Sequence, residues 1–157
     1  MHELEVVNIR LVREPSLYSE IPVTSPESAI KILAKELAAY DREAVFILNL
    51  QSNGKVINLN IVSLGTVNSA LISSRELFKS SILSNAASVI MIHNHPGGSL
   101  EPSQQDIQIT RKIQKGGEIL DIPLLDHIIV AGVSGKTYSF RDAGLLENQK
   151  DKVRNER

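Results

Sequence analysis

The sequence contains no cysteine, which excludes disulfides, thiolate metal sites and thiol catalysis. Aromatic residues make up only 4% of the chain, so few side chains could stack on nucleic-acid bases. No apolar run approaches the roughly 18 residues that a membrane span requires. The N-terminus, Met-His-Glu-Leu-Glu, also lacks the basic and apolar regions of a secretory signal. We therefore expect a cytoplasmic protein that does not engage a membrane.

The chain also lacks an excess of charge of either sign. It has 17 Lys and Arg residues against 18 Asp and Glu residues, a net charge of -1. This balance offers no electrostatic footprint for a polyanion, so we expect no strong nucleic-acid binding by this domain alone. The 157 residues, 42% of them hydrophobic, suit one domain that folds around its own core. The oligomeric state stays open at this point.

Strand and helix patterns alternate along the chain and predict a single α/β domain, with helices flanking a mixed β-sheet. Thr24-Ser25-Pro26-Glu27 and Ser73-Ser74-Arg75-Glu76 both have the capping residues of a helix start. Gly116-Gly117 predicts the end of a helix that begins at Ser103. The segment 87–92 is nearly all apolar, as is typical of a central strand covered on both faces. The predicted strands are 4–12, 43–50, 56–63 (joined to the previous strand by an Asn53-Gly54 hairpin turn), 87–92, 124–130 and 137–140, and the predicted helices are 24–40, 73–84 and 103–115.

The segment 93–106, His-Asn-His-Pro-Gly-Gly-Ser-Leu-Glu-Pro-Ser-Gln-Gln-Asp, carries the most informative chemistry. Residues i and i+2 of an extended strand point to the same side, so His93 and His95 can present two imidazoles to one point while Asn94 faces away. The Gly-Gly pair lets the chain reverse, and Asp106 falls in the first turn of the next helix. Two His and one carboxylate leave a fourth zinc position open, which is the pattern of a catalytic site. We therefore predict that zinc is held by His93, His95 and Asp106.

Each of these residues taken alone has a structural explanation. Ser103-Gln104-Gln105-Asp106 could be only an N-cap, with Asp106 favoured near the positive end of the helix dipole. His93 and His95 could be polar residues at the end of a strand. Capping and metal binding are compatible, however, and capping does not explain the His-x-His pair. A non-haem iron site shares two His and one carboxylate, so metal analysis would be needed to separate it from zinc.

The spacing of His93-x-His95, seven residues, Ser103, two residues and Asp106 resembles the JAMM (JAB/MPN) metalloprotease motif. The fuller text, His-Asn-His-Pro-Gly-Gly, then Pro-Ser-Gln-Gln-Asp and later Ile-Pro-Leu-Leu-Asp-His-Ile-Ile-Val, resembles the RadC branch of that family. Gly97-Gly98 stands where this branch has Ser-Gly, a change that touches no ligand. The likeness covers residues 24–146. It leaves 1–23 as an N-terminal strand and connection and 147–157 as a charged tail that we expect to be disordered.

This resemblance implies a cytidine-deaminase-like α/β fold with zinc on the two His and the Asp. It implies that the family's Ser, here Ser103, orients or stabilises the oxyanion. It also implies a general base, a Glu that precedes an apolar strand on an earlier element, and Glu43 fits that place. Glu76 is the second candidate for the base, although it already has a local role in a capping box.

The function implied by the resemblance is a zinc-dependent hydrolase that cleaves a peptide or isopeptide amide in an unidentified peptide or protein substrate. The alternative is a DNA-repair-associated role, because the RadC name carries that label; the metal site would then be nucleic-acid-linked or a non-catalytic scaffold. Intact Glu43 and Ser103 argue against an inert scaffold. Asp126-His127 lies on a later strand, where neighbours face opposite ways. At most one of the two can therefore serve the site. The structural explanation is a hydrogen-bonded core residue, and the functional alternative is a carboxylate that orients a ligand His.

Overall fold

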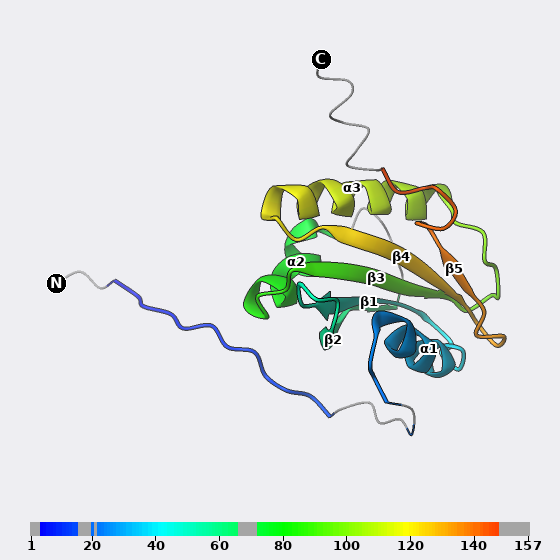
Figure 1. Cartoon of the computed structure of the whole chain (residues 1–157), viewed down its shortest axis with the longest axis horizontal. Coiled ribbons are helices and arrows are strands. Elements are labelled where there is room, and N and C mark those ends of the chain that lie inside the picture. The colour runs from blue at the N-terminus through cyan, green and yellow to red at the C-terminus, as the bar shows by residue number, and fades with distance from the viewer. Residues whose placement is uncertain (1–3, 16–19, 21, 66–71, 148–157) are drawn as a thin grey trace, which may run out of the picture.

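Five strands form one mixed sheet in the order β2-β1-β3-β4-β5 (Figure 1). The computed structural model describes residues 4–15, 20, 22–65 and 72–147. β3 and β4 run parallel, and the other neighbouring strands run antiparallel, which confirms the predicted mixed sheet. The strands are β1 (Glu43–Leu50), β2 (Val56–Gly65), β3 (Ser88–His95), β4 (Leu124–Ala131) and β5 (Thr137–Ser139), and the helices are α1 (Pro26–Leu37), α2 (Ser74–Leu83) and α3 (Gln104–Leu120).

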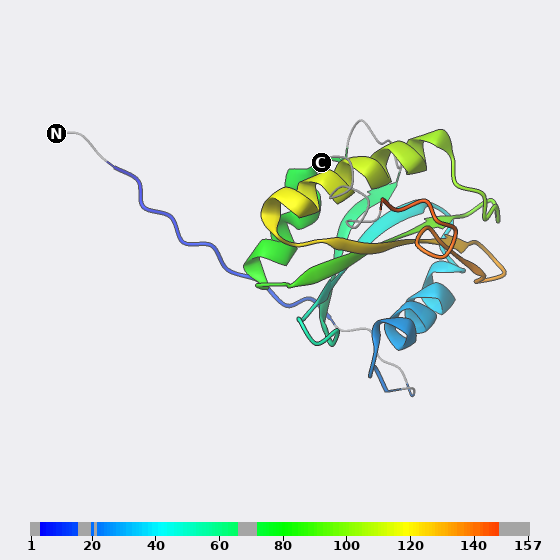
Figure 2. The ribbon, with the colours of Figure 1, turned by 45° about the horizontal axis from the view of Figure 1, so that its top comes forward.

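Helices cover both faces of the sheet (Figure 2). On one face, Leu37 of α1 packs in a cluster with Phe46 of β1. On the other face, Phe78 of α2 and Ile113 of α3 pack with Met91 of β3. β1 and β3 are therefore buried on both sides, which is why the segments 44–48 and 89–92 are continuously apolar instead of alternating.

The alternation of side chains along β3 decides which of its residues reach each face. Ile92 belongs to the cluster under α1, and Met91 belongs to the cluster under α2 and α3. Continuing the alternation puts His93 and His95 on the α3 side and Asn94 on the α1 side. The predicted separation of the two His from Asn94 follows directly from the strand.

The predicted helix caps are present, but the capping box expected at 73–76 is only half formed, because the Glu76 carboxylate bonds Lys79 and not the Ser73 N–H. Ser25 caps α1 in a capping box with Ser28. Ser73 caps α2 by accepting the Glu76 N–H. Gly54, in the hairpin between β1 and β2, adopts φ +82°, a conformation that glycine tolerates without strain.

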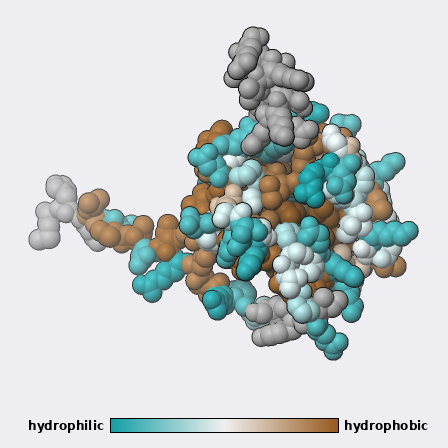
Figure 3. All heavy atoms as spheres, in the orientation of Figure 1, coloured by the Kyte–Doolittle hydropathy of each residue, from teal (hydrophilic) through white to brown (hydrophobic). Residues whose placement is uncertain are grey.

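The strand expected at 4–12 is wrong. Within the described part of the chain, residues 4–15 pair with no strand and form an extended arm that leaves the domain (Figure 1). Their large apolar side chains are exposed, with Leu4 88% and Val12 82% accessible, and much of the arm is coloured as hydrophobic in Figure 3. An apolar, β-branched segment becomes a strand only when it pairs with the edge of a sheet, and residues 4–15 pair with no edge.

The third helix does not end at Gly116-Gly117 as predicted. α3 continues to Leu120 and ends where Asp121 adopts the left-handed conformation, φ +57°. A Cβ atom on Gly117 would lie 2.5 Å from the Ile122 carbonyl oxygen, so this glycine lets the helix pack closely on the chain that follows. A glycine inside a helical pattern therefore marks a packing contact here and not a helix end.

The remaining boundaries differ little. α1 ends at Leu37, somewhat before the predicted limit at residue 40. Of the predicted tail 147–157, only Glu147 belongs to the described residues, and the rest lies outside them. Among the helices that the structure describes, none has the length and apolarity to cross a membrane.

Candidate metal centre

The candidate site lies at the carboxyl end of β3, beside the amino end of α3. β3 ends at His95 and α3 begins at Gln104. Between them Gly98 adopts φ +86°, and its N–H donates to the His95 carbonyl at 3.0 Å. The Gly132 N–H, just after β4, donates to the same carbonyl at 2.8 Å. These bonds hold the turn against the sheet, so that the first turn of α3 faces the end of β3.

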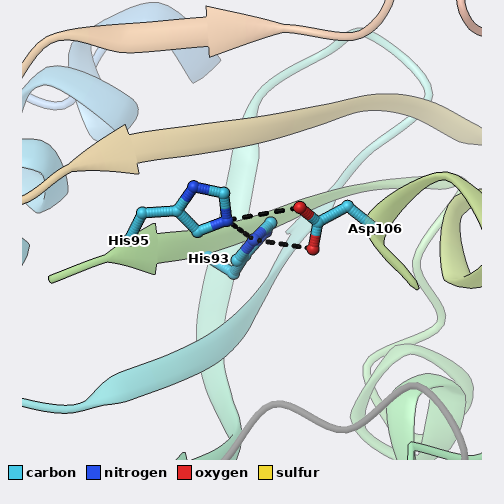
Figure 4. A group of neighbouring side chains, drawn as sticks. All are labelled: His93, His95 and Asp106. Atoms are coloured by element: carbon cyan, nitrogen blue, oxygen red, sulfur yellow. Dashed lines mark hydrogen bonds and ion pairs between the residues drawn. The ribbon is translucent and has the colours of Figure 1, made fainter. Parts of the chain in front are cut away.

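The side chains of His93, His95 and Asp106 point toward one another (Figure 4). The Nε2 atoms of the two histidines lie 2.9 Å apart. His93 Nε2 is 3.2 Å from Asp106 Oδ1, and His95 Nε2 is 3.3 Å from Asp106 Oδ2. One ligand atom from each residue can be chosen so that all three lie within 4.8 Å of one another. The fold thus brings together the three residues that the spacing singled out.

Burial and the proximity of charged groups shift the pKa values of Asp106 and His95. His93 and Asp106 are buried, and His95 is half-buried. Burial by itself favours the neutral carboxyl group, but hydrogen bonds from His93 and His95 in their protonated forms outweigh it and hold the pKa of Asp106 well below its usual range. The hydrogen bond to Asp106 raises the pKa of His95 against the effect of burial, and the Ser99 carbonyl and the charge of Glu43 add to the rise.

The donor set fits a zinc ion. His95 Nδ1 lies 2.9 Å from the Ser99 carbonyl oxygen, and because a carbonyl can only accept, the ring proton sits on Nδ1. In neutral His95 the Nε2 atom then carries a lone pair directed into the cluster. Imidazole nitrogen and carboxylate oxygen are ordinary zinc ligands, and three of them leave a fourth position for water or substrate.

Ser103 and Asp106 form the capping box of α3. The Ser103 Oγ accepts the Asp106 N–H at 3.1 Å, and Asp106 Oδ2 accepts the Ser103 N–H at 2.7 Å. The Asp106 side chain therefore has both of the roles considered for this segment. It takes part in the cap of α3, and it belongs to the candidate metal cluster. Ser103 is exposed and lies at the start of the helix that carries Asp106.

Glu43 and Glu76 lie in different surroundings. β1 begins at Glu43 and runs antiparallel to β3, which ends at His95, so both residues lie at the same end of the sheet. Glu43 is half-buried, and its negative charge contributes to the raised pKa of His95. Glu76 is exposed on α2, where its carboxylate oxygens accept from Lys79 Nζ at 3.1 and 3.2 Å. The catalytic role of either residue stays a prediction.

Asn94 faces away from the cluster, as predicted, and holds the start of β1. Its Oδ1 accepts the Ala44 N–H at 2.7 Å, and its Nδ2 donates to the Arg42 carbonyl at 2.9 Å. Asn94 is completely buried. One side chain therefore fixes the backbone on both sides of Glu43. The sequence gives no local signal for this contact, because it depends on the pairing of β1 with β3.

His127 contacts the cluster from β4. Its Nε2 lies 2.6 Å from His93 Nδ1, and its Nδ1 lies 2.6 Å from Thr110 Oγ1 on α3. The ring stacks on Phe140 with centroids 4.4 Å apart and planes at 17°. Thr110 was not singled out in the sequence, where it is one of many polar residues of a helix.

Asp126, the neighbour of His127, faces the other way. Its Oδ2 accepts the Ser139 hydroxyl at 2.6 Å, and its Oδ1 accepts the Arg141 N–H at 2.9 Å. These bonds fix the chain around the end of β5. The expectation that at most one of the pair contacts the site is confirmed. The residue that does so is the imidazole of His127, whereas the carboxylate that we considered is structural.

Fold and site together define an α/β domain with a candidate metal centre at the end of its central strand. The family profile of the RadC-like JAB domain matches residues 23–145, and the chain belongs to this family. The arm at 4–15 lies outside the match.

Curated relatives support the same assignment. A UPF0758 protein of Methanosarcina mazei is 34% identical over 140 residues, which cover 87% of this chain and 60% of the relative. A UPF0758 protein of Pelodictyon phaeoclathratiforme is 38% identical over 126 residues, 79% of this chain and 55% of the relative. One from Finegoldia magna is 39% identical over 109 residues, 69% of this chain and 49% of the relative. The chain thus spans about half to three-fifths of the length of these relatives.

Proposed function

We propose that this domain is a zinc-dependent hydrolase that cleaves a peptide or isopeptide amide. The observation that carries the proposal is the convergence of two imidazoles and a carboxylate around one point, with His95 only half-buried. A structural zinc site would be closed by four protein ligands, whereas three leave room for the reacting groups. Membership of the RadC-like JAB family supports hydrolytic chemistry.

His93, His95 and Asp106 would hold the metal. When bound, zinc supplies Lewis acidity, which lowers the pKa of a coordinated water to about 7 and polarises a substrate carbonyl. The buried, anionic Asp106 contributes the negative charge that favours a divalent cation in this position. The same carboxylate is held in place by the Ser103 N–H, so the ligand is oriented before any metal arrives.

Glu43 would handle the proton. It lies at the same end of the sheet as His95, and Asn94 fixes the backbone on both sides of it. In the proposed reaction the Glu43 carboxylate accepts a proton from the attacking water. It then returns a proton to the leaving nitrogen, which an amine needs in order to depart from the collapsing intermediate.

Ser103 would donate to the developing oxyanion. Its Oγ already accepts the Asp106 N–H, so the orientation of the side chain is fixed while the hydroxyl proton can be donated outward. One such donor contributes at most about 2.7–4 kcal/mol to transition-state stabilisation. Ser103 should therefore matter less to the rate than Glu43.

The test begins with metal analysis of the purified chain. We expect about one zinc per molecule, and His93→Ala and Asp106→Ala should each abolish it. Wild type and Glu43→Gln, both loaded with zinc, are then compared on a proteome-derived peptide library and on isopeptide-linked probes by mass spectrometry. Glu43→Gln should retain zinc and lose about 10²–10⁴-fold in turnover, because Gln matches Glu in shape but cannot carry the proton.

Glu76→Gln is the matched control, because it changes the other candidate base. It should leave turnover unchanged, since Glu76 is exposed and bonded to Lys79. If full zinc occupancy persists in both ligand variants, the metal lies elsewhere. If Glu76→Gln is inactive and Glu43→Gln is active, the assignment of the base is wrong.

A further inference from the structure

A chain of buried hydrogen bonds runs from α3 to the candidate ligand His93. It begins at Thr110, whose Oγ1 lies 2.6 Å from the backbone carbonyl oxygen of Asp106 one helical turn earlier. A carbonyl oxygen can only accept, so the Thr110 hydroxyl proton is directed to it. One end of this series of hydrogen bonds is the Asp106 backbone carbonyl. The other end is His93, whose side chain lies in the same cluster as that of Asp106.

The same Thr110 oxygen lies 2.6 Å from His127 Nδ1. Because its only proton is already donated, the oxygen must accept here, and the donor is the Nδ1–H of His127. His127 is completely buried and stacked on Phe140, and its two ring nitrogens contact Thr110 Oγ1 and His93 Nδ1, neither of them a carboxylate that would hold a second proton on the ring. A neutral imidazole has one ring proton, so its Nε2 can only accept.

The remaining link fixes His93. His127 Nε2 lies 2.6 Å from His93 Nδ1, and since Nε2 accepts, His93 Nδ1 donates. Neutral His93 then has its lone pair on Nε2, the atom 2.9 Å from His95 Nε2 and 3.2 Å from Asp106 Oδ1. A lone pair and a carboxylate oxygen at that separation repel unless a cation lies with them. The relay thus prepares the cluster for a metal ion.

We propose that Thr110 and His127 form a positioning relay, which fixes the tautomer of His93 so that Nε2 is presented to the metal. The inference rests on the proposed zinc site and adds two residues that act on it through His93. It also explains why a buried histidine with a fixed aromatic neighbour stands on β4, where an apolar residue would otherwise complete the core. Neither residue would touch the substrate.

The experiment measures zinc affinity and the His93 tautomer in the same variants. Thr110→Val is nearly isosteric and removes the hydroxyl, while Thr110→Ser keeps it and serves as the matched control. His127→Leu removes the relay, while His127→Gln can still accept from His93 and donate to Thr110. Affinity is read by competition with a chromophoric chelator, and the tautomer by nitrogen-15 NMR of the imidazoles in the metal-free protein.

We expect wild-type His93 to be protonated on Nδ1 and unprotonated on Nε2 without metal. Thr110→Val and His127→Leu should populate the other tautomer and lose about 10–100-fold in zinc affinity, whereas Thr110→Ser should bind as the wild type does. His127→Gln should recover most of the loss. Thermal unfolding of the metal-free variants accompanies each titration, because a merely structural defect would lower stability without moving the tautomer.

Two results would overturn the inference. One is a wild-type His93 that carries its proton on Nε2 in the metal-free protein, and this holds even if every variant fails to fold. The other is unchanged affinity and tautomer in folded Thr110→Val and His127→Leu. A wild-type protein that binds no zinc would instead count against the proposed function, while the NMR result would still judge the relay.

Discussion

Asn94 holds the Arg42 carbonyl and the Ala44 N–H with one buried amide. Asn94→Ala should leave both groups without a partner and lower the free energy of unfolding by about 1–3 kcal/mol. It should also release the backbone at Glu43, so that the Ala44 amide loses its protection from hydrogen exchange. Both quantities are measurable on the metal-free protein, by denaturant unfolding and by NMR exchange.

Asn49→Ala is the matched control for Asn94→Ala. Asn49 is equally buried in β1, and its amide bonds Asn58 and Ser80 far from the cluster. It should lose similar stability while zinc-dependent turnover is retained. If Asn94→Ala keeps full turnover and normal hydrogen exchange at Ala44, the two hydrogen bonds that Asn94 makes on either side of Glu43 have no functional consequence.

His95 makes zinc binding depend on pH. Its pKa is raised, chiefly by the hydrogen bond to Asp106, so the metal-free protein carries a proton on His95 over a wider range than an ordinary histidine. A metal must displace that proton. Zinc affinity should therefore be lost as pH falls through the His95 pKa, by about tenfold per pH unit below it, and should be insensitive to His95 above it.

Asp106 should not contribute to that slope. Its pKa is held below the usual range, so it stays ionised throughout the same titration. Calorimetry in buffers of different ionisation enthalpy counts the protons released on binding and checks the prediction. An affinity that stays level from neutral pH down to about pH 5 would contradict the role of His95 as a ligand.

At the level of single residues, the sequence predicts what lies close in the chain. His93, His95 and Asp106 are joined by strand alternation and one glycine turn, so their convergence could be anticipated. His127 and Asn94 contact their partners only through strand pairing and helix packing. No spacing along the chain predicts those contacts. The alternation of side chains along β4 shows that Asp126 and His127 face opposite sides, but not which of them faces the cluster.

At the level of secondary structure, α3 organises the site and depends on a close contact at its far end. Gly117→Ala would normally favour a helix by about 1 kcal/mol. Here the new Cβ would lie 2.5 Å from the Ile122 carbonyl oxygen, a backbone atom that cannot rotate away. We therefore expect a net loss of about 1–3 kcal/mol in the free energy of unfolding.

Gly116→Ala provides the comparison on the adjacent residue. Its Cβ would come no closer than 3.1 Å to the Ser74 side chain, which can move by a few tenths of an ångström. This variant should be close to neutral in the same denaturant titration. Equal stability of the two variants would show that α3 does not need glycine at position 117.

These glycines also show where prediction of the elements succeeds and fails. Caps and hairpin turns are decided by a few adjacent residues, so Ser25, Ser73, Ser103 and Gly54 act as predicted. Gly117 has a tertiary cause, and a sequence cannot distinguish a packing glycine from a terminating one. The arm at 4–15 has a strand-like composition but finds no sheet edge, which is likewise a property of the assembled sheet.

At the scale of the whole molecule, the surface bears on the alternative role linked to nucleic acid. A groove between α2 and α3 is lined by apolar residues together with Arg75, Lys79, Lys112 and Lys115. Two of these cations are already engaged, since Lys79 bonds Glu76 at 3.1 Å and Lys112 donates to the Ile72 carbonyl at 3.0 Å. The groove thus offers a polyanion few uncommitted charges.

With a net charge of -1, this chain should bind DNA weakly. Arg75 and Lys115 could neutralise about two phosphates, which corresponds to a slope of about -2 in log affinity against log salt. We expect a Kd weaker than about 1 µM for duplex and single strands at physiological salt, measured by fluorescence anisotropy across a salt series. Submicromolar binding with a steeper slope would contradict this. Loss of that binding in the double variant Arg75→Glu, Lys115→Glu, with zinc content unchanged, would then assign it to the groove and favour a nucleic-acid-linked role for the domain.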